Sequence, residues 1–220
     1  MLYDFHTHTF LSDGVLLPIE LIRRAVANGY TAIGIADHAS YSTLNHVVEA
    51  LVRDCRLAEE HWEIRAIVGV EITHVPPPAI PDLARQARER GAQYVVCHGE
   101  TPVEPVPPGT NLAALQCPDV DVLAHPGPIT AEMAALAAKN QVFLELSARR
   151  GHSLANGAVA AAARMAGAML LVDSDGHEPG DLLTEEFARR VAAGAGLTEQ
   201  EAEAALVANP RRLLARIDGR

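Results

Sequence analysis

Residues that can bind a metal follow almost every apolar segment of this 220-residue chain. The first are His6 and His8, which follow a short apolar start and precede Asp13. In an extended chain residues i and i+2 point to the same side, so both imidazoles can face one site. Two imidazoles and a nearby carboxylate suit a transition metal. An HxH motif is short, however, and surface histidines beside a loop explain this stretch alone equally well.

The other histidines and acids of the chain repeat this placement. Five further apolar segments are each closed or followed by metal-binding residues, namely His38, Glu71, His98, His125 and the pair Asp175 and His177. Each residue taken singly is as readily structural as a ligand, but their shared position favours a metal centre. His46 and His61 lie in a helical pattern and are predicted to be surface residues. His74 and His152 lie in loops, where a pocket role and a structural role both stay open.

Apolar segments alternate with helical patterns along the whole chain. Strands are predicted at residues 2–8, 32–38, 66–72, 94–98, 120–125, 142–146 and 169–173. Thr198 with Glu201 forms a capping-box pattern for a late helix, which Asn209 and Pro210 are expected to break. This βαβ order predicts parallel strands with helices outside. The C-terminal ends of such strands are where barrel enzymes build their sites.

Composition limits the class of protein. With 49% hydrophobic and 21% charged residues, the chain is expected to form one domain, residues 1–220, with its own core. The net charge of −10 argues against a long nucleic acid as partner, because such binding normally needs clustered Lys and Arg. No segment resembles a signal peptide or a membrane span, and three cysteines without metal-like spacing favour a cytoplasmic protein. No pattern indicates an oligomeric state.

Six segments in order along the chain resemble motifs of the polymerase and histidinol phosphatase (PHP) superfamily. They are HTHTFLSDG, ADH, GVEIT, CHGE, LAHPG and DSDGH. The resemblance runs from residue 4 to residue 177. It implies an α/β fold, a distorted seven-stranded (β/α) barrel of the TIM-like PHP type. It also implies a metal-dependent hydrolase that acts on phosphoesters.

The same resemblance implies a site with three divalent metal ions, for which manganese, iron and zinc are the candidates. The implied ligands are His6, His8, Glu71 and Asp175 for the first ion, Glu71, His98 and His125 for the second, and Asp13, His38 and His177 for the third. Asp173 competes with Asp175, although the spacing to His177 favours Asp175. Two divalent ions about 3.5–4 Å apart can lower the pKa of a shared water and neutralise phosphate oxygens.

Groups able to bind phosphate follow the sixth predicted strand. Arg149 or Arg150 can hold phosphate oxygens through paired hydrogen bonds. The alternative is that both are solvent-exposed loop residues without a role in binding. His152 beside them is a candidate proton donor to the leaving group. In the Pro-rich segment 99–111, Glu100 or Thr101 is placed to line the pocket and contribute specificity.

Several chemistries compete for these residues. A two-metal amidohydrolase also begins with HxH but usually needs a carboxylated lysine at a strand end, and the single lysine, Lys139, closes a helical pattern. The favoured function is hydrolysis of a small phosphomonoester, such as histidinol phosphate or another metabolite. Two alternatives stay open: a phosphodiesterase or nuclease acting on nucleotides or short oligonucleotides, and a metal-binding module without catalytic activity.

Overall fold

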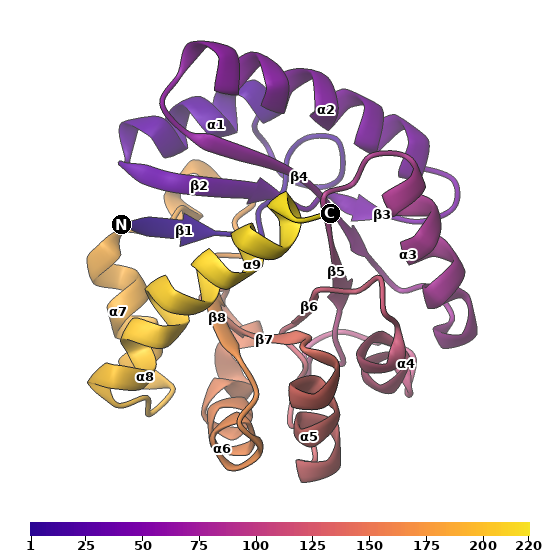
Figure 1. Ribbon diagram of the computed structural model, residues 1–220, viewed down its shortest axis with the longest axis vertical. Helices are drawn as coiled ribbons and strands as arrows, with labels where there is room; N and C mark the ends of the chain where they lie inside the picture. Colours follow the sequence, from indigo (N-terminus) through magenta and orange to yellow (C-terminus); the bar gives the residue numbers. More distant parts are fainter.

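Seven parallel strands form the wall of a barrel in the computed structural model, which describes residues 1–220. Their order around the wall follows the sequence (Figure 1): β1 (Leu2–Asp4), β2 (Tyr30–Ile35), β4 (Arg65–Ile72), β5 (Tyr94–His98), β6 (Val122–Ala124), β7 (Phe143–Ser147) and β8 (Leu170–Asp173). The short strand β3 (His38–Ala39) pairs with the end of β4. The predicted distorted (β/α) barrel is therefore confirmed.

The barrel is nearly closed where β1 meets β8. An isolated bridge links the segments that follow the two strands. Two side chains add to this seam: the amide of Phe5 donates to Asp173 Oδ1 at 2.7 Å, and the amide of Ser174 donates to Asp4 Oδ1 at 3.1 Å. Buried carboxylates thus replace part of the backbone pairing that a full ladder would supply.

Helices surround the barrel wall (Figure 1). They are α1 (Pro18–Ala27), α2 (Leu44–His61), α3 (Ile80–Glu89), α4 (Thr110–Gln116), α5 (Ala131–Asn140), α6 (Asn156–Ala166), α7 (Glu185–Gly194), α8 (Glu199–Glu203) and α9 (Asn209–Asp218). Short helical turns are η1 (Pro77–Ala79), η2 (His152–Ala155), η3 (Pro179–Asp181) and the π-helical η4 (Ala204–Ala208). None of the helices combines the length and apolarity needed to cross a membrane.

Apolar side chains form two cores, one on each side of the barrel wall. The larger lies between the strands and the surrounding helices, and the smaller fills the interior near the starts of the strands. Tyr94 is fully buried in this inner core, and Gly34 and Gly69 leave the room that its ring needs. Leu213 and Ile217 of α9 pack into the same core and close this end. Polar residues gather at the opposite end, where the strands finish.

Two predicted strands end three or four residues earlier than expected, next to the site. β1 stops at Asp4, so the HxH pair lies beyond the strand rather than on it. Asp4 Oδ1 accepts from the amide of His6 at 3.2 Å, which takes the place of a ladder hydrogen bond. The strand predicted over residues 32–38 ends at Ile35, because the carboxylate of Asp37 binds the amide of Thr9 at 2.7 Å.

The late helix expected to break at Asn209 and Pro210 continues instead. The capping box of Thr198 with Glu201 begins α8, as predicted. The π-helical segment η4 then leads directly into α9, which starts at Asn209. Pro210 lies in the first turn of α9. A proline is tolerated at this position, because the first turn of a regular helix does not need its missing N–H.

Candidate metal centre

The C-terminal end of the barrel gathers the residues singled out from the sequence. The histidines and acids come from the segments after β1, from β3, β4 and β5, and from the segments after β6 and β8: His6, His8, Asp13, His38, Glu71, His98, His125, Asp175 and His177. Most are buried; Asp13 is exposed and His38 is half-buried. This is the end at which barrel enzymes place their sites.

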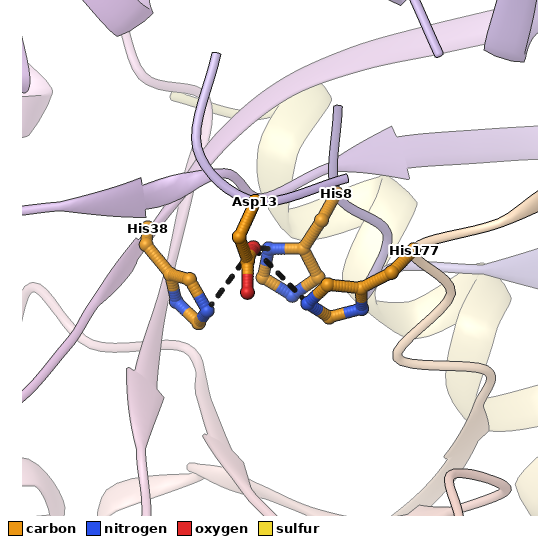
Figure 2. Close-up of side chains that lie close together, drawn as sticks. All are labelled: His8, Asp13, His38 and His177. Carbon is orange, nitrogen blue, oxygen red and sulfur yellow. Dashed lines mark ion pairs between the residues drawn. The ribbon is translucent and has the colours of Figure 1, made fainter. Parts of the chain in front are cut away.

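One group surrounds the carboxylate of Asp13 (Figure 2). Asp13 Oδ1 lies 3.1 Å from His177 Nε2, 3.4 Å from His38 Nε2 and 3.9 Å from His8 Nδ1. Partial burial acts to raise the pKa of Asp13, but the contacts with His177 and His38 outweigh it and hold this pKa well below its usual range. The residues implied for the third ion, together with His8, therefore lie within reach of one ion.

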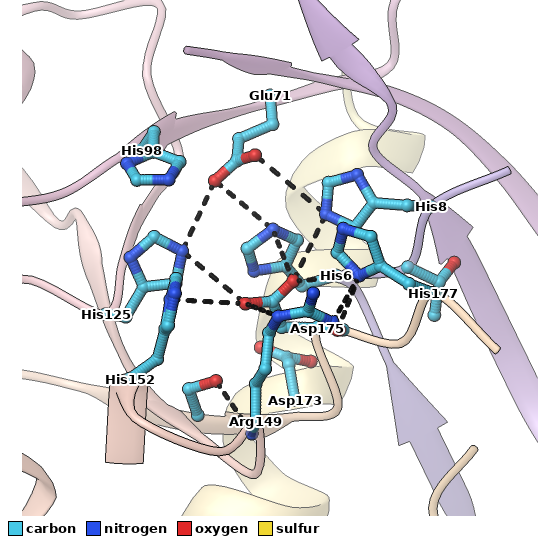
Figure 3. A network of polar contacts seen from close by, with 12 residues as sticks. His6, His8, Glu71, His98, His125, Arg149, His152, Asp173, Asp175 and His177 are labelled. Carbon is cyan, nitrogen blue, oxygen red and sulfur yellow. Dashed lines mark hydrogen bonds and ion pairs between the residues drawn. The ribbon is translucent and has the colours of Figure 1, made fainter. Parts of the chain in front are cut away.

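A second group surrounds Glu71 and Asp175 (Figure 3). Glu71 Oε1 lies 3.2 Å from His6 Nε2 and 3.5 Å from His125 Nε2. Asp175 Oδ1 lies 3.3 Å from His8 Nε2 and 3.9 Å from His6 Nε2. The four residues implied for the first ion thus meet here, and His125 joins them.

The charges of these groups depend on one another. Burial opposes a charge on Glu71, yet His6, His98 and His38 hold the pKa of its carboxyl well below the ordinary value. Burial also opposes a charge on His38, but Glu71 and the neighbouring Asp13 raise its pKa to about 10. Burial, with other imidazoles nearby, lowers the pKa of the His8 ring to about 3. An ionised Glu71 and a neutral His8 are the forms that bind metals.

Several buried atoms of the centre have no hydrogen-bond partner. They are Nε2 of His6, both ring nitrogens of His8, Oε1 of Glu71, Nδ1 of His125 and Oδ2 of Asp175. Each unsatisfied buried polar group costs about 1–3 kcal/mol, so a cluster of them requires a common partner. A divalent ion is such a partner, because imidazole nitrogens and carboxylate oxygens are its usual ligands. The chain therefore has clusters able to bind metal.

Other groups fix the orientation of the histidine rings. Nδ1 of His6 is 2.5 Å from Oε2 of Glu145, which is fully buried on β7. Nδ1 of His38 is 2.6 Å from Thr73 Oγ1, and that of His98 is 3.2 Å from a backbone carbonyl. Metal-binding histidines are commonly held in this way through the second ring nitrogen. The sequence analysis missed Glu145, whose only signal is an acid within a buried strand.

His98 departs from the arrangement that the sequence implies. Its ring centroid lies 4.4 Å from that of His125, but its Nε2 is 3.2 Å from Glu104 Oε2 and groups with Glu104 and His74. The set implied for the second ion is thus only partly brought together, with Glu71 near His125 while His98 Nε2 faces the loop after β5. No sequence pattern points to Glu104, the second of two acids in a Pro-rich loop.

Asp173 and Asp175 have separate places in the structure (Figure 3). Asp173 accepts the amide of Phe5 in the barrel seam, and burial together with the neighbouring Asp4 raises the pKa of its carboxyl well above the ordinary value. Asp175 has a positive φ of 52° and faces His8. Of the two acids, Asp175 is the one at the centre.

Arg149 reaches the centre, whereas Arg150 lies at its rim. Nη1 of Arg149 is 2.7 Å from Nδ1 of His177 and 3.1 Å from the carbonyl oxygen of Asp175. Arg150 is exposed, and with Arg149 it lines a cavity of about 370 Å³. His152 is buried, with Nδ1 3.4 Å from Asp175 Oδ2. Arg149 and His152 thus contact residues of the centre, whereas Arg150 does not.

The remaining candidates divide between the site and the scaffold. The carboxylate of Glu100 accepts the amides of Gly109 and Asn111, at 3.1 and 2.8 Å, so it holds its loop against the start of α4. Thr101 is buried beside it. His46 and His61 are exposed, as predicted. His74 contacts Glu104 at 3.1 Å, which places it at the edge of the centre.

Sequence comparisons match the chain partly or over nearly its whole length. A family model for the PHP domain matches residues 4–144. An uncharacterized protein of Methanocaldococcus jannaschii is 47% identical over 218 residues, which cover 99% of this chain and 100% of that protein. A 5′–3′ exoribonuclease of Haemophilus influenzae is 35% identical over 71 residues, which cover 32% of this chain and 23% of that enzyme.

Solved structures share the fold. A chain of archaeal ribonuclease P with mature tRNA has a TM-score of 0.70 at 15% identity, covering 99% of this chain and 91% of that one. A chain from the structures of YwqE of Bacillus subtilis and CpsB of Streptococcus pneumoniae, named as metal-dependent tyrosine phosphatases, has a TM-score of 0.61 at 19% identity, covering 98% and 95%. These likenesses concern the fold alone. Because the PHP-domain family model matches residues 4–144, the chain belongs to the PHP-domain family, whose members are metal-dependent phosphoesterases.

Proposed function

We propose that this protein hydrolyses a small phosphomonoester with the help of bound divalent metal ions. The observation that carries the proposal is the set of buried, unpartnered nitrogen and oxygen atoms of His6, His8, Glu71 and Asp175. Such a set is expensive in a protein that binds nothing there. It is the donor set of a hydrolytic metal centre.

The proposed centre holds three ions, with manganese, iron or zinc as the metals. His6, His8, Glu71 and Asp175 would hold the first, Glu71, His125 and His98 the second, and Asp13, His38 and His177 the third. When bound, divalent ions lower the pKa of a water molecule and neutralise the charge on phosphate oxygens. Glu71 is central because its two oxygens face His6 and His38 respectively, at 3.2 and 2.6 Å.

Protein groups have separate tasks in this proposal. The guanidinium of Arg149 lies beside the centre and is placed to bind phosphate oxygens in the fixed fork that arginine provides. The Nδ1 atom of His152, which faces Asp175, would donate a proton to the leaving oxygen. Because His152 is buried, that proton transfer is shielded from bulk water.

The arginine beside the centre suits a small substrate with an anionic group. Arg149 and Arg150 also line a cavity of about 370 Å³ with Ser174, Asp181 and Phe187, whereas none of the proposed metal ligands lines it. The net charge of −10 still argues against a long nucleic acid as substrate.

We also propose that the enzyme acts in the cytoplasm, since its three buried cysteines are free thiols.

A second candidate function is hydrolysis of phosphodiesters in nucleotides or short oligonucleotides. The partial match to the exoribonuclease of Haemophilus influenzae supports it, although that match covers only 32% of this chain. Diester cleavage would use the same metal ligands and would differ in the group that the cavity must accept.

The test is release of inorganic phosphate by manganese-reconstituted protein from a panel of phosphomonoesters that includes histidinol phosphate. Cleavage of dinucleotides and short oligonucleotides is followed in parallel by product chromatography. The proposal predicts turnover of a monoester that disappears when a chelator is added. Cleavage of diesters alone would contradict the phosphomonoesterase proposal and support the second candidate, a phosphodiesterase. Metal binding without hydrolysis of either class would contradict both and leave a non-catalytic metal-binding module.

A further inference from the structure

The loop between β5 and α4, residues 99–109, places one carboxylate against three histidines. Glu104 Oε2 lies 3.1 Å from His74 Nε2 and 3.2 Å from His98 Nε2. Its other oxygen, Oε1, lies 3.1 Å from His152 Nε2. One carboxylate thus contacts three imidazole nitrogens.

The distances suit shared coordination of a metal. Two ligand atoms about 2.1 Å from the same ion, at roughly right angles, lie about 3 Å apart. The separations of Glu104 Oε2 from His74 Nε2 and His98 Nε2 match that spacing, and all three atoms form one close group. Two imidazoles and one carboxylate leave the remaining positions of an ion open to water or substrate.

The surroundings of this group prepare it for a ligand. Nδ1 of His98 is engaged by the carbonyl of Gly99, which leaves Nε2 free to bind. The side chains of His74 and Glu104 are 36% and 37% exposed, so an ion can reach them from solvent. His74 also has a φ of 53°, a left-handed conformation that is uncommon for a residue other than glycine.

We infer that His74, His98 and Glu104 form an outer metal position at the mouth of the barrel. Its occupant is a divalent transition ion such as Mn²⁺, Fe²⁺ or Zn²⁺, because imidazole nitrogen and carboxylate oxygen together favour these metals. The position adjoins the centre on which the proposed function rests. Because Nε2 of His98 binds one ion at a time, an ion held here takes His98 from the second position, where Glu71 and His125 remain as ligands. It adds two residues, His74 and Glu104, that the PHP resemblance does not imply.

An ion at this position would also fix a loop. Glu104 lies near the middle of residues 99–109 and contacts three histidines, and its neighbour Val103 lies against Gly151, next to His152. Holding Glu104 on an ion therefore orders the loop against the segment that carries Arg149 and His152. The outer position would in this way link metal binding to the shape of the substrate pocket.

The experiment uses the full chain and two variants, Glu104→Gln and His74→Ala. Glu49→Gln, an exposed acid on α2, is the matched control. Each metal-free protein is titrated with Mn²⁺ by calorimetry, and the bound metal is counted by elemental analysis. We expect both variants to bind one ion fewer than wild type, or to bind one ion about tenfold or more weakly, while Glu49→Gln matches wild type.

Hydrogen exchange gives a second reading that does not depend on activity. Addition of Mn²⁺ should slow exchange of the backbone amides at positions 101, 103, 104 and 106, between the prolines of this loop, in wild type and in Glu49→Gln but not in Glu104→Gln. If Glu104→Gln binds the same number of ions with the same affinities and shows the same protection, the outer position is wrong. In that case the short contacts of Glu104 are hydrogen bonds to protonated imidazoles.

The outer position and the proposed function can fail separately. Phosphate release by wild type, together with unchanged metal binding in Glu104→Gln, would remove the outer position and keep the phosphatase. Loss of one ion in Glu104→Gln, together with no hydrolysis of any phosphoester by wild type, would keep the outer position and remove the proposed activity.

Discussion

Glu71 Oε1 and His6 Nε2 lie 3.2 Å apart in the metal centre, and neither atom has a hydrogen-bond partner. Both side chains are fully buried. Such an arrangement is costly for a protein that leaves the atoms unsatisfied, and it is normal for two ligands of one metal. The proposed chemistry depends on this pair, and the predictions below follow from it and from the groups around it.

Replacing Glu71 by alanine should abolish phosphate release. Glu71 contacts His6, His38 and His125 and would hold two of the proposed ions, so its loss should reduce activity by more than about 100-fold and also reduce the metal content. Phosphate release and elemental analysis on the same preparation measure both effects, and circular dichroism checks the fold. Wild-type activity in this variant would overturn the metal mechanism.

Replacing Glu145 by glutamine should weaken the centre without dismantling it. Glu145 holds Nδ1 of His6 at 2.5 Å and touches no substrate in the proposed mechanism. Changes at groups that orient a metal-binding histidine typically cost about 10–100-fold in metal affinity or activity. Competition with a coloured chelator measures the affinity. An unchanged manganese affinity would show that this contact does not support the centre.

Replacing Arg149 by alanine should raise KM more than it lowers kcat. A hydrogen bond to a charged group is worth about 1.5–3 kcal/mol, so a lost phosphate contact predicts a rise in KM of about tenfold or more. Arg150→Ala should have a smaller effect, because Arg150 is exposed and lacks the contacts of Arg149 with His177 and Asp175. If steady-state kinetics of both variants match wild type, the phosphate is held by other groups.

Removing the metal should lower the stability of the protein. A ligand that binds only the folded state and is present at 100 times its Kd stabilises that state by about 2.7 kcal/mol. We therefore expect a chelator to lower the Tm of wild type and to change that of Glu71→Ala much less. Thermal scans with and without excess Mn²⁺ test this. Equal shifts in the two proteins would place the stabilising ion elsewhere.

The buried acid Asp4 should make the stability of the metal-free protein depend on pH. Burial raises the pKa of Asp4 to about 7, against 3.8 for an exposed aspartate. Between these values the folded chain keeps a proton that the unfolded chain releases, so the contribution of Asp4 is present at low pH and is lost as pH rises towards 7. Urea unfolding from pH 4 to pH 8 measures this dependence.

In the variant Asp4→Asn, the free energy of unfolding should change less between pH 4 and pH 7 than in wild type. An amide oxygen can still accept from the amides of His6 and Ser174, and the side chain no longer titrates. Glu49→Gln, which changes an exposed acid, should leave the slope as it is in wild type. If Asp4→Asn shows the same fall in stability from pH 4 to pH 7 as wild type, Asp4 does not hold the proton.

The barrel could be predicted from the sequence because the patterns that indicate it lie within short stretches of the chain. Alternation of apolar strands with helical patterns identifies parallel strands, and the register of β4 against β5 then brings Glu71 and His98 to the same end. His46 and His61 were also predictable as surface residues, since they fall on the exposed side of α2. Such features need no knowledge of which distant segments touch.

Other features depend on contacts between distant segments. β1 ends at Asp4 because the carboxylates of Asp4 and Asp173 bind amides across the barrel seam, from opposite ends of the chain. Glu145 supports His6 across 139 positions of sequence, and Glu104 meets His98 only through the path of its loop. No local pattern carries such pairings, which is why the sequence analysis missed both glutamates.

An anomalous difference map from a crystal of the manganese-loaded protein tests the central claim most directly. The account predicts peaks within coordinating distance of His6 Nε2 and Glu71 Oε1, and of Asp13 Oδ1 with His177 Nε2. A map with no peak at either place, from protein loaded with excess Mn²⁺, would contradict it. The unpartnered atoms of the centre would then have to be satisfied by water or by protons rather than by metal.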